Sequence, residues 1–386
     1  MPAARVQAAI EILDEILESD CAAETIVTRW SRRSRFAGVK DRAVVRDHIY
    51  DALRNLRSYA VQGGGMRGRA IMIGALLSQD SDLNSIFNGQ GYAPTELKPE
   101  EIGPFPEASL QESLDIPDWL WPIWSRDLGD QANETAETLK HRASVFLRVN
   151  LIKSSVENAI EMLDKDGIKA IAHETVPTAL LVLENARRIS HSDSFLEGLV
   201  ELQDASSQMS ICNLPSNMEG DILDFCAGGG GKSLALSAWL KRKVVAHDAV
   251  PLRMKDLPNR AARAGLHVEC RSEDELTKEG FGLVFCDVPC SGSGAWRRDP
   301  WGKRVLTEDT FETIVQTQAQ ILSKASGYVK SGGILAYATC SVLKTENVLQ
   351  IERFVADHPT WEILESTQIM VSEGGDGFFY SYMRKA

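Results

Sequence analysis

Apolar residues recur at helical spacing in the first sixty residues of the chain. In residues 3–18 one helical face is formed by Ile10, Leu13, Ile16 and Leu17. In residues 41–61 a second stripe is formed by Val45, Ile49, Leu53 and Leu56. Three consecutive glycines at residues 63–65 then interrupt the pattern. The front of the chain is therefore predicted to be all-α.

Residues 80–118 have a different composition. They hold nine acidic residues against one lysine, together with five prolines, which is typical of a linker. The segment runs into the sequence DWLWPIW, which begins at Asp118. Its three tryptophans favour a packing anchor onto a neighbouring domain, with a stacking platform for bases as the alternative.

The rest of the chain alternates between strand and helix patterns. Residues 145–190 hold a strand, a helix and a second strand, which predicts a small α+β module. From residue 220 onward, strand candidates separated by helical stretches predict a doubly wound α/β sheet. These candidates are Asp221–Ala227, Lys243–Asp248, His267–Cys270, Gly282–Val288, Gly333–Thr339 and Gly377–Met383. We expect three parts: helices with the acidic linker in residues 1–130, the small module in 140–200, and the α/β domain in 201–386.

The composition is that of a globular protein. With 386 residues, 44% of them hydrophobic and 25% charged, the chain should form two or three domains. No apolar run approaches the ~20 residues that cross a bilayer, and the first twenty residues lack a signal-peptide pattern, so we expect a soluble cytoplasmic protein. The seven cysteines include no CxxC pair and the seven histidines no HExxH spacing. Neither a disulfide framework nor a metal site is predicted.

The charge is unevenly distributed. A formal net charge of −12 argues against general binding of nucleic acid. Between Arg29 and Arg69, however, eleven arginines and lysines face three aspartates, whereas residues 1–28 hold one arginine and six acids. This basic segment could form a local footprint for phosphates. A solvated helix face with paired charges explains it equally well.

A glycine-rich turn joins an apolar strand to a helix in DILDFCAGGGGKSLALSAWL. Glycine permits close backbone approach, and the N–H groups at the start of the helix attract polar ligands, so the segment predicts a cofactor loop. The residues expected at the cofactor are Cys226, Ala227, Gly228, Gly229, Gly230, Gly231 and Lys232. A phosphate-binding P-loop would need glycine in place of Cys226, and a dinucleotide GxGxxG would need it in place of Ser233. Both nucleotide interpretations are weak.

Asp248 ends the next predicted strand, twenty-four residues after Asp224. A carboxylate at this position suits the two ribose hydroxyls of an adenosine-containing cofactor. A cap for the following helix is the alternative role. The neighbouring glycine loop favours the ligand interpretation.

Two later strands each end on a cysteine at a small polar turn. The first reads FGLVFCDVPCSGSGAWRRDP and contains Cys290, and the second reads GGILAYATCSVLKTENVLQIERF and contains Cys340. Strand ends of this kind are where α/β enzymes place reactive groups. A lone strand-end cysteine is usually a small buried hydrophobe, so the prediction of chemistry depends on the sequences around the pair.

Those sequences resemble the RsmB/Sun family of RNA cytosine-C5 methyltransferases. The family patterns are roughly LDxCAAPGGKT, DAPCSGxGxxRRxP and YxTCSxxxxEN, followed by DGFF. This chain has LDFCAGGGGKS, DVPCSGSGAWRRDP and YATCSVLKTEN, then DGFF at residues 376–379, and QDASSQMS at 203–210 resembles a segment before the family's first motif. The resemblance covers the last half of the chain. It implies a Rossmann-like methyltransferase domain that uses S-adenosyl-L-methionine.

The front half is similar to the same family more loosely. FAGVKDRAVVRDHIYDALR resembles the NusB-like helical RNA-binding domain of bacterial members, and VFLRVNLIKSSVENAIEML resembles the RRM-like module before their catalytic domain. Together they imply the ribosomal branch, with 16S rRNA as the leading substrate and tRNA as the alternative. The target cytosine would have to be unstacked, which favours single-stranded or loop RNA. We expect a monomer.

The resemblance implies a role for each of four residues. Cys340 would add to carbon 6 of cytosine and make carbon 5 nucleophilic. Asp287 would hydrogen-bond the N3/N4 edge of the base, close to the cofactor. Cys290 would assist release of the product from Cys340, and Lys232 would orient the cofactor and the catalytic groups.

Other features of the resemblance concern the cofactor and the RNA. The family has an acid near the adenine, which counting places at Asp274, with Glu273 as the alternative. The family's loop proline is a glycine here, Gly229 or Gly230 depending on register. A glycine loses rigidity but keeps backbone access, so cofactor binding should be retained. The arginines of RRDP, residues 297 and 298, are expected to contact RNA phosphates or to pair with nearby acids.

Two other functions stay open. DNA cytosine-C5 methyltransferases also use a Pro-Cys motif and a Glu-Asn-Val tripeptide, present here at residues 346–348, and Cys290 would then be the nucleophile. The second cysteine and the helical front fit the RNA family better. A non-catalytic RNA-binding assembly factor is the other alternative, against which stand the intact Cys290, Cys340 and Asp287.

Overall fold

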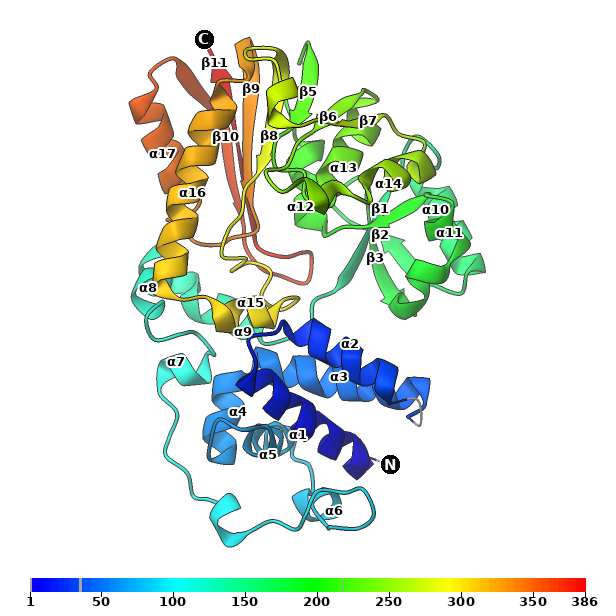
Figure 1. The fold of residues 1–386 in the computed structure, drawn as a ribbon, viewed down its shortest axis with the longest axis vertical. Coiled ribbons are helices and arrows are strands. Elements are labelled where there is room, and N and C mark those ends of the chain that lie inside the picture. Colours follow the sequence, from blue (N-terminus) through cyan, green and yellow to red (C-terminus); the bar gives the residue numbers. More distant parts are fainter. Residues whose placement is uncertain (1, 35–36, 217) are drawn as a thin grey trace. The chain divides into compact units, whose positions relative to one another are not determined.

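The computed structural model describes residues 2–34, 37–216 and 218–386. The chain forms two compact units (Figure 1). Unit 1 comprises residues 1–142 and 296–306, and unit 2 comprises residues 143–295 and 307–386. Residues 296–306, expected in the α/β domain, thus belong to the helical unit. Arg35 of the basic segment and Phe36, the first residue of the segment expected to be NusB-like, lie outside the described residues.

Unit 1 is helical, as the front pattern predicts. Its elements are α1 (Pro2–Glu18), α2 (Ala23–Arg33), α3 (Val39–Arg54), α4 (Leu56–Gly63), α5 (Gly68–Leu77), α6 (Leu83–Ile86), η1 (Pro99–Glu101), α7 (Leu110–Ser113), α8 (Trp121–Leu128), η2 (Gly129–Gln131), α9 (Ala132–Leu139) and α15 (Pro300–Val305). Both predicted apolar stripes enter one core, where Leu13 and Ile49 are fully buried. The second stripe spans two helices, because α3 ends at Arg54 and α4 begins at Leu56, with Asn55 between them.

The predicted linker is only partly irregular. It contains α6, η1 and α7, and its last part is fastened to α4 by the buried carboxylate of Asp115. That carboxylate accepts hydrogen bonds from the Arg57 N–H at 2.7 Å and from the Ser58 hydroxyl at 2.6 Å. The composition of the segment did not predict this anchor.

Buried packing, predicted for the tryptophan segment, is confirmed for Trp124, but its partner lies in the same unit and not in a neighbouring domain. Its ring is fully buried and stacks on Trp296 at a centroid distance of 5.8 Å. Beside this stack, the Arg54 Nε donates to the Arg297 carbonyl oxygen at 2.6 Å. The Arg297 side chain is 2% exposed, so here it is packed inside the protein rather than presented to RNA, whereas Arg298 is exposed.

Unit 2 begins with a small antiparallel sheet. Its elements are β1 (Val145–Val149), α10 (Val156–Lys165), β2 (Lys169–Ala172), β3 (Ala179–Glu184), η3 (Ala186–His191), α11 (Asp193–Leu196) and β4 (Val200–Leu202). The strand order is β2-β3-β1-β4, and every pairing is antiparallel. This βαββαβ order is the ferredoxin-like arrangement, which confirms the predicted α+β module.

The remainder of unit 2 confirms the predicted α/β fold. Its elements are α12 (Ala205–Cys212), β5 (Asp221–Asp224), α13 (Gly231–Leu240), β6 (Val244–Ala246), η4 (Pro251–Met254), α14 (Leu257–Ala264), β7 (Val268–Cys270), η5 (Glu273–Glu275), β8 (Phe281–Asp287), α16 (Glu308–Ser326), β9 (Val329–Thr339), α17 (Val348–Asp357), β10 (Trp361–Ile369) and β11 (Phe378–Lys385). The sheet order is β10-β11-β9-β8-β5-β6-β7. The strands from β9 to β7 are parallel, and β11 and β10 are antiparallel to their neighbours.

This topology defines where a ligand can bind. Helices α13 and α14 pack near β6 and β7, and α16 and α17 pack on the opposite face against β8, β9 and β10 (Figure 1). The chain order reverses between β5 and β8, and at such a switch point the loops diverge to open a crevice beyond the carboxyl ends of the strands. Among the described helices, none combines the length and the apolar character that crossing a membrane requires.

Candidate active site

A cavity of about 670 Å³ lies at the carboxyl ends of β5, β6, β8 and β9. It brings together most of the residues predicted from sequence. Those that line it are Cys226, Ala227, Gly228, Gly229, Gly231, Lys232, Asp248, Asp287, Cys290 and Cys340. Gly230 and Asp274 are not among its lining residues. One cavity therefore contains the glycine loop and both predicted cysteines.

The glycine loop has two positions with left-handed backbone. Gly228 has φ +53° and Gly230 has φ +84°, and proline cannot adopt a positive φ. Gly229 is therefore the residue at the position of the family's proline. Gly230 has a packing role: a Cβ there would lie 2.2 Å from the Leu257 side chain. The loop needs that glycine so that it can pack against α14.

Asp248 fastens the loop to the end of β6. Its Oδ2 accepts the Gly228 N–H at 2.8 Å, and its Oδ1 accepts the Val250 N–H at 2.9 Å. The Arg253 guanidinium lies 3.2 Å from Oδ2. The carboxylate is thus held in one orientation at the cavity wall, as a group that recognises a pair of hydroxyls requires.

The predicted adenine-side acid lies at the edge of this region. Asp274 is exposed on η5. Its neighbour Glu273 accepts hydrogen bonds from Lys324 Nζ at 2.6 Å and from the Tyr328 hydroxyl at 3.2 Å, and Lys324 lines the cavity. Consecutive side chains on a 3-10 turn point in different directions, which favours Glu273 over Asp274 as the acid nearer the cavity.

Lys232 and Asp287 form an ion pair within the cavity wall. The Lys232 Nζ lies 2.6 Å from Asp287 Oδ2 and 5.2 Å from the centre of the Phe378 ring, which belongs to the DGFF motif. Burial alone lowers the pKa of Lys232, but the charge and hydrogen bond of Asp287, with a further contribution from Cys340, outweigh it and raise that pKa. Lys232 therefore remains a cation beside both Asp287 and Cys340.

The sulfurs of the two cysteines are in contact at the wall of the cavity. Cys290 Sγ lies 3.4 Å from Cys340 Sγ, although fifty residues separate them in sequence. The hydrogen bond with Cys340, and then burial, raise the pKa of the Cys290 thiol well above its usual range. Cys290 therefore keeps its proton at neutral pH and can share it with the Cys340 sulfur.

A buried glutamate joins the two cysteine loops. The Glu346 carboxylate accepts hydrogen bonds from the Ser291 N–H at 2.7 Å and from the hydroxyls of Ser291 and Ser341. Each serine directly follows one of the cysteines. Gln318 of α16 donates a further bond at 3.0 Å. Burial raises the pKa of Glu346 despite these donors, and the fully buried side chain is not among the cavity's lining residues.

Backbone contacts fasten the same loops to the DGFF segment. The Gly294 N–H donates to the Cys340 carbonyl at 2.9 Å, and the Gly377 N–H donates to the Gly294 carbonyl at 2.9 Å. A Cβ on Gly294 would lie 2.1 Å from the Gly377 carbonyl oxygen. Both glycines are needed because the two backbones approach so closely. Three motifs that are distant in sequence thus share one set of bonds.

Asp224 lies beneath the glycine loop, outside the cavity's lining residues. It is fully buried; its Oδ2 accepts a bond from the Ser233 hydroxyl at 2.6 Å, and its Oδ1 has no partner among the described residues. Burial raises the pKa of Asp224 to about 7 against the opposing bond from Ser233, and the charge of Asp287 adds to the rise. Folding therefore favours the protonated form of this carboxyl.

We expect this group to make stability depend on pH. An unfolded aspartate titrates near 3.8, so the stabilisation from protonated Asp224 is complete below that pH and is lost as pH rises through about 7. Without cofactor, the Tm of the wild type should therefore fall more steeply between pH 5 and pH 8 than the Tm of an Asp224→Asn protein, measured by scanning calorimetry. Equal slopes for the two proteins would contradict the raised pKa.

The structure adds residues to which the sequence assigned no role. The cavity is also lined by Gln203 and Ser207, which belong to the QDASSQMS segment, and by Thr317, Ile321 and Lys324 of α16. Gln203 and Ser207 could have been predicted, because the segment that contains them resembles a family segment. The α16 residues recur at helical spacing on one face, a pattern that sequence cannot distinguish from an ordinary packing face.

Comparisons with known proteins relate this chain to rRNA methyltransferases. Residues 211–383 match the family described as 16S rRNA methyltransferase RsmB/F, and residues 116–190 match a ferredoxin-like domain described for RsmF/B-like methyltransferases. The chain is 31% identical over 284 residues to ribosomal RNA small subunit methyltransferase B of Escherichia coli O6:K15:H31, covering 70% of this chain and 66% of the relative. The corresponding protein of Serratia proteamaculans is 29% identical over the same shares. The chain thus spans just under two thirds of the length of these curated relatives.

Solved structures share the fold. A structure of the protein PH0851 covers 100% of this chain and 99% of its own, with TM-score 0.82 and 23% identity. A methyltransferase homolog protein from Pyrococcus horikoshii covers 72% of this chain and 98% of its own, with TM-score 0.62 and 23% identity. NSun6 from the same organism, solved with SFG, has TM-score 0.60 at 16% identity, over 70% of this chain and 98% of its own. At these identities the likeness concerns the fold alone.

Proposed function

We propose that this chain, which belongs to the RsmB/F family of 16S rRNA methyltransferases, transfers a methyl group from S-adenosyl-L-methionine to carbon 5 of a cytosine in RNA. The observation that carries the proposal is the pair of cysteine sulfurs 3.4 Å apart in the same cavity as the glycine loop. A cytosine at that position would lie within reach of both thiols and of the cofactor's binding residues. Small-subunit ribosomal RNA is the leading substrate, by analogy with the relatives' names.

The cavity suits the proposed cofactor. Gly228, Gly229 and Gly231 leave space along the loop for a close backbone contact. The fixed Asp248 carboxylate would accept hydrogen bonds from the ribose hydroxyls, and Glu273 would be the acid nearer the adenine. When bound, the cofactor supplies an electrophilic methyl group on a sulfonium.

Carbon 5 of cytosine is too weak a nucleophile to take that methyl group unaided. Cys340 would add its sulfur to carbon 6, which gives carbon 5 carbanion character. Asp287 would hydrogen-bond the N3/N4 edge and stabilise the charge that develops on the ring. Lys232 holds the Asp287 carboxylate in place through its 2.6 Å ion pair and keeps a positive charge near the reacting groups.

Release then requires a base and a leaving group. The proton on carbon 5 must depart, and the bond between Cys340 and carbon 6 must break. The hydrogen bond to Cys340 is the leading cause of the raised pKa of Cys290, and that cause weakens once the Cys340 sulfur is bonded to carbon. Cys290 would then lose its own proton to solvent more readily, and its thiolate would remove the proton from carbon 5 while Cys340 leaves carbon 6 as a thiolate.

We assign RNA binding to the helical unit and the ferredoxin-like module. Arg32 and Arg33 at the end of α2, and Lys40 at the start of α3, are exposed and belong to the basic segment. Other charges of that segment are engaged within the protein, such as Arg46 with Glu24 at 2.8 Å. The footprint for phosphates is therefore proposed for the exposed subset.

The first experiment is methyl transfer from labelled S-adenosyl-L-methionine to unmodified small-subunit rRNA, with nucleoside analysis of the product. Parallel reactions contain tRNA, double-stranded DNA or no nucleic acid. We expect label in 5-methylcytosine of rRNA. Label in tRNA alone would keep the chemistry and change the substrate, and label in DNA alone would establish the DNA-type alternative. No cofactor binding and no label anywhere would contradict an enzymatic function.

A further inference from the structure

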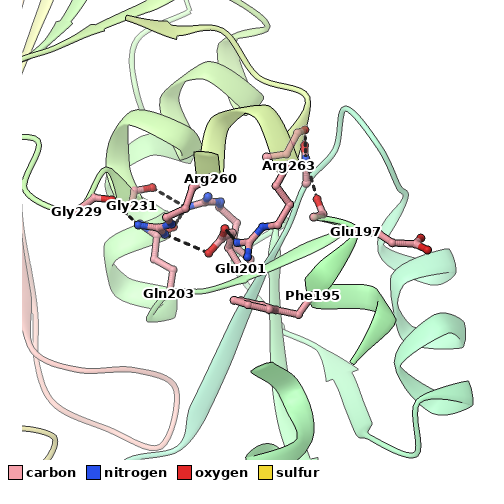
Figure 2. A network of polar contacts seen from close by, with 12 residues as sticks. Phe195, Glu197, Glu201, Gln203, Gly229, Gly231, Arg260 and Arg263 are labelled. Atoms are coloured by element: carbon pink, nitrogen blue, oxygen red, sulfur yellow. Dashed lines mark hydrogen bonds and ion pairs between the residues drawn. The ribbon is translucent and has the colours of Figure 1, made fainter. Parts of the chain in front are cut away.

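A buried glutamate of the ferredoxin-like module binds two arginines of the α/β fold. Glu201 on β4 is 5% exposed. Its Oε2 accepts a bond from the Arg260 Nη2 at 3.1 Å, and its Oε1 accepts a bond from the Arg263 Nη2. Both arginines lie on α14, and Figure 2 shows them converging on this carboxylate. Ion pairs between Glu201 and the two arginines thus connect the ferredoxin-like module to the α/β fold.

The same network reaches the carbonyl groups of the glycine loop. Arg260 Nη1 donates to the Gly229 carbonyl oxygen (Figure 2). Arg148 on β1 of the ferredoxin-like module donates to the Gly231 carbonyl oxygen at 2.8 Å, and also to Gln203 Oε1. Arg260 and Arg148 therefore hold the glycine loop at two of its carbonyl groups. Neither arginine is among the residues that line the cavity.

The position of α14 is itself held by the module. Asn150 Nδ2 donates to the Ala264 carbonyl oxygen at 2.8 Å, and Lys153 Nζ donates to the Arg263 carbonyl oxygen at 2.6 Å. These bonds cover carbonyl groups at the end of α14, which have no partner within the helix. The ferredoxin-like module therefore fixes both the helix that carries Arg260 and the guanidinium itself.

The loop has a particular need for such support. Four consecutive glycines lose more conformational freedom on ordering than any other residues, and Gly229 stands where the family pattern has a rigid proline. A loop that must be ordered by the ligand binds it more weakly than one ordered in advance. Charged hydrogen bonds to the loop carbonyls supply order in the absence of the proline ring.

We propose that Arg260 and Arg148, supported by Glu201, are positioning residues that order the glycine loop for the cofactor. They act through the Gly229 and Gly231 carbonyls and do not touch the ligand. The ferredoxin-like module, here assigned to RNA binding, thereby also contributes to cofactor affinity. This inference rests on the proposed function, because it requires the cofactor to occupy this cavity.

The test compares Arg260→Ala with Arg263→Ala. Arg263 shares the bond to Glu201 and lies over the Phe195 ring at 4.3 Å. Neither of these contacts is with the glycine loop, which makes Arg263 a matched control. Calorimetric titration with S-adenosyl-L-methionine should give a Kd about tenfold higher for Arg260→Ala and within about twofold of wild type for Arg263→Ala. Arg260→Lys should recover part of the affinity, because a single donor can still reach one partner.

A second readout needs no cofactor. The Gly230 N–H donates to the Ala227 carbonyl at 2.8 Å and closes the turn of the loop. In the ligand-free protein, this amide should exchange with deuterium faster in Arg260→Ala than in wild type or Arg263→Ala.

The outcomes separate the two proposals. A wild-type protein that does not bind the cofactor would contradict the proposed function itself. Normal binding by wild type, with unchanged affinity and exchange in Arg260→Ala, would overturn the positioning role alone. Equal losses in Arg260→Ala and Arg263→Ala would also overturn it, because they would indicate general destabilisation.

Discussion

A Cys290→Ala protein is expected to accumulate a covalent adduct with RNA, whereas a Cys340→Ala protein is expected to form none. The two sulfurs lie 3.4 Å apart, but we propose that Cys340 acts in the first step of the reaction and Cys290 in the last. In the proposed mechanism Cys340 makes the bond to carbon 6, so its loss should lower methyl transfer on the order of 10⁴-fold or more. The role proposed for Cys290 follows methylation, so loss of Cys290 should leave the methylated base bonded to Cys340.

The adduct would be seen as a slowly migrating band on a denaturing gel that disappears after nuclease digestion. Its formation should require S-adenosyl-L-methionine if release is the step that fails. Cys270→Ala, which removes an exposed cysteine outside the cavity, is the matched control and should behave as wild type. An adduct in Cys340→Ala but not in Cys290→Ala would reverse the roles and support the DNA-type scheme.

Glu346→Ala is expected to lower kcat/KM on the order of a hundredfold, the effect of a small misplacement of reacting groups. The substitution removes the acceptor shared by Ser291, Ser341 and Gln318, so both cysteine loops lose their common anchor. Glu346→Gln keeps the shape and one acceptor oxygen, and its effect should be intermediate. The affinity for S-adenosyl-L-methionine should stay within about twofold of wild type, because the Glu346 bonds described above go to the cysteine loops and α16 rather than to the glycine loop.

The control for Glu346 is Glu352→Gln, which changes an exposed glutamate of α17. Thermal melts of all variants at one pH show whether the fold survives. The informative measurement is the rate of adduct formation when Glu346→Gln is combined with Cys290→Ala. A rate equal to that of Cys290→Ala alone would show that Glu346 has no part in placing Cys340.

The sequence predicted the α/β fold well because its strands are apolar and end at recognisable turns. β10 was missed because it is an edge strand, WEILESTQI, in which apolar and charged residues do not alternate regularly. The site was predicted where a motif had a distinct chemistry, as at Cys290, Cys340 and the glycine loop. Each of these lines the cavity.

What the sequence could not predict depends on contacts between distant segments. Glu346 stands in the EN pair of its motif, but only the fold shows that its carboxylate joins the two cysteine loops. Arg260 has no motif, and its bond to Gly229 depends on how α14 packs. The count that placed an acid at Asp274 failed to separate it from Glu273, because one residue of register decides which side chain faces Lys324.

Residues 296–306 belong to the helical unit although they follow most of the α/β fold in sequence, and this order affects folding during synthesis. Trp296 completes the buried stack on Trp124, and Lys303 donates to the Arg54 carbonyl at 3.0 Å. A ribosome makes roughly 5–20 residues per second, so the helices up to residue 142 leave the exit tunnel well before this piece is available. During synthesis the Trp124 ring of the helical unit therefore stays exposed until residues 296–306 have been made. A chain released before residue 306 would keep this apolar surface exposed, and we expect chaperones to bind it.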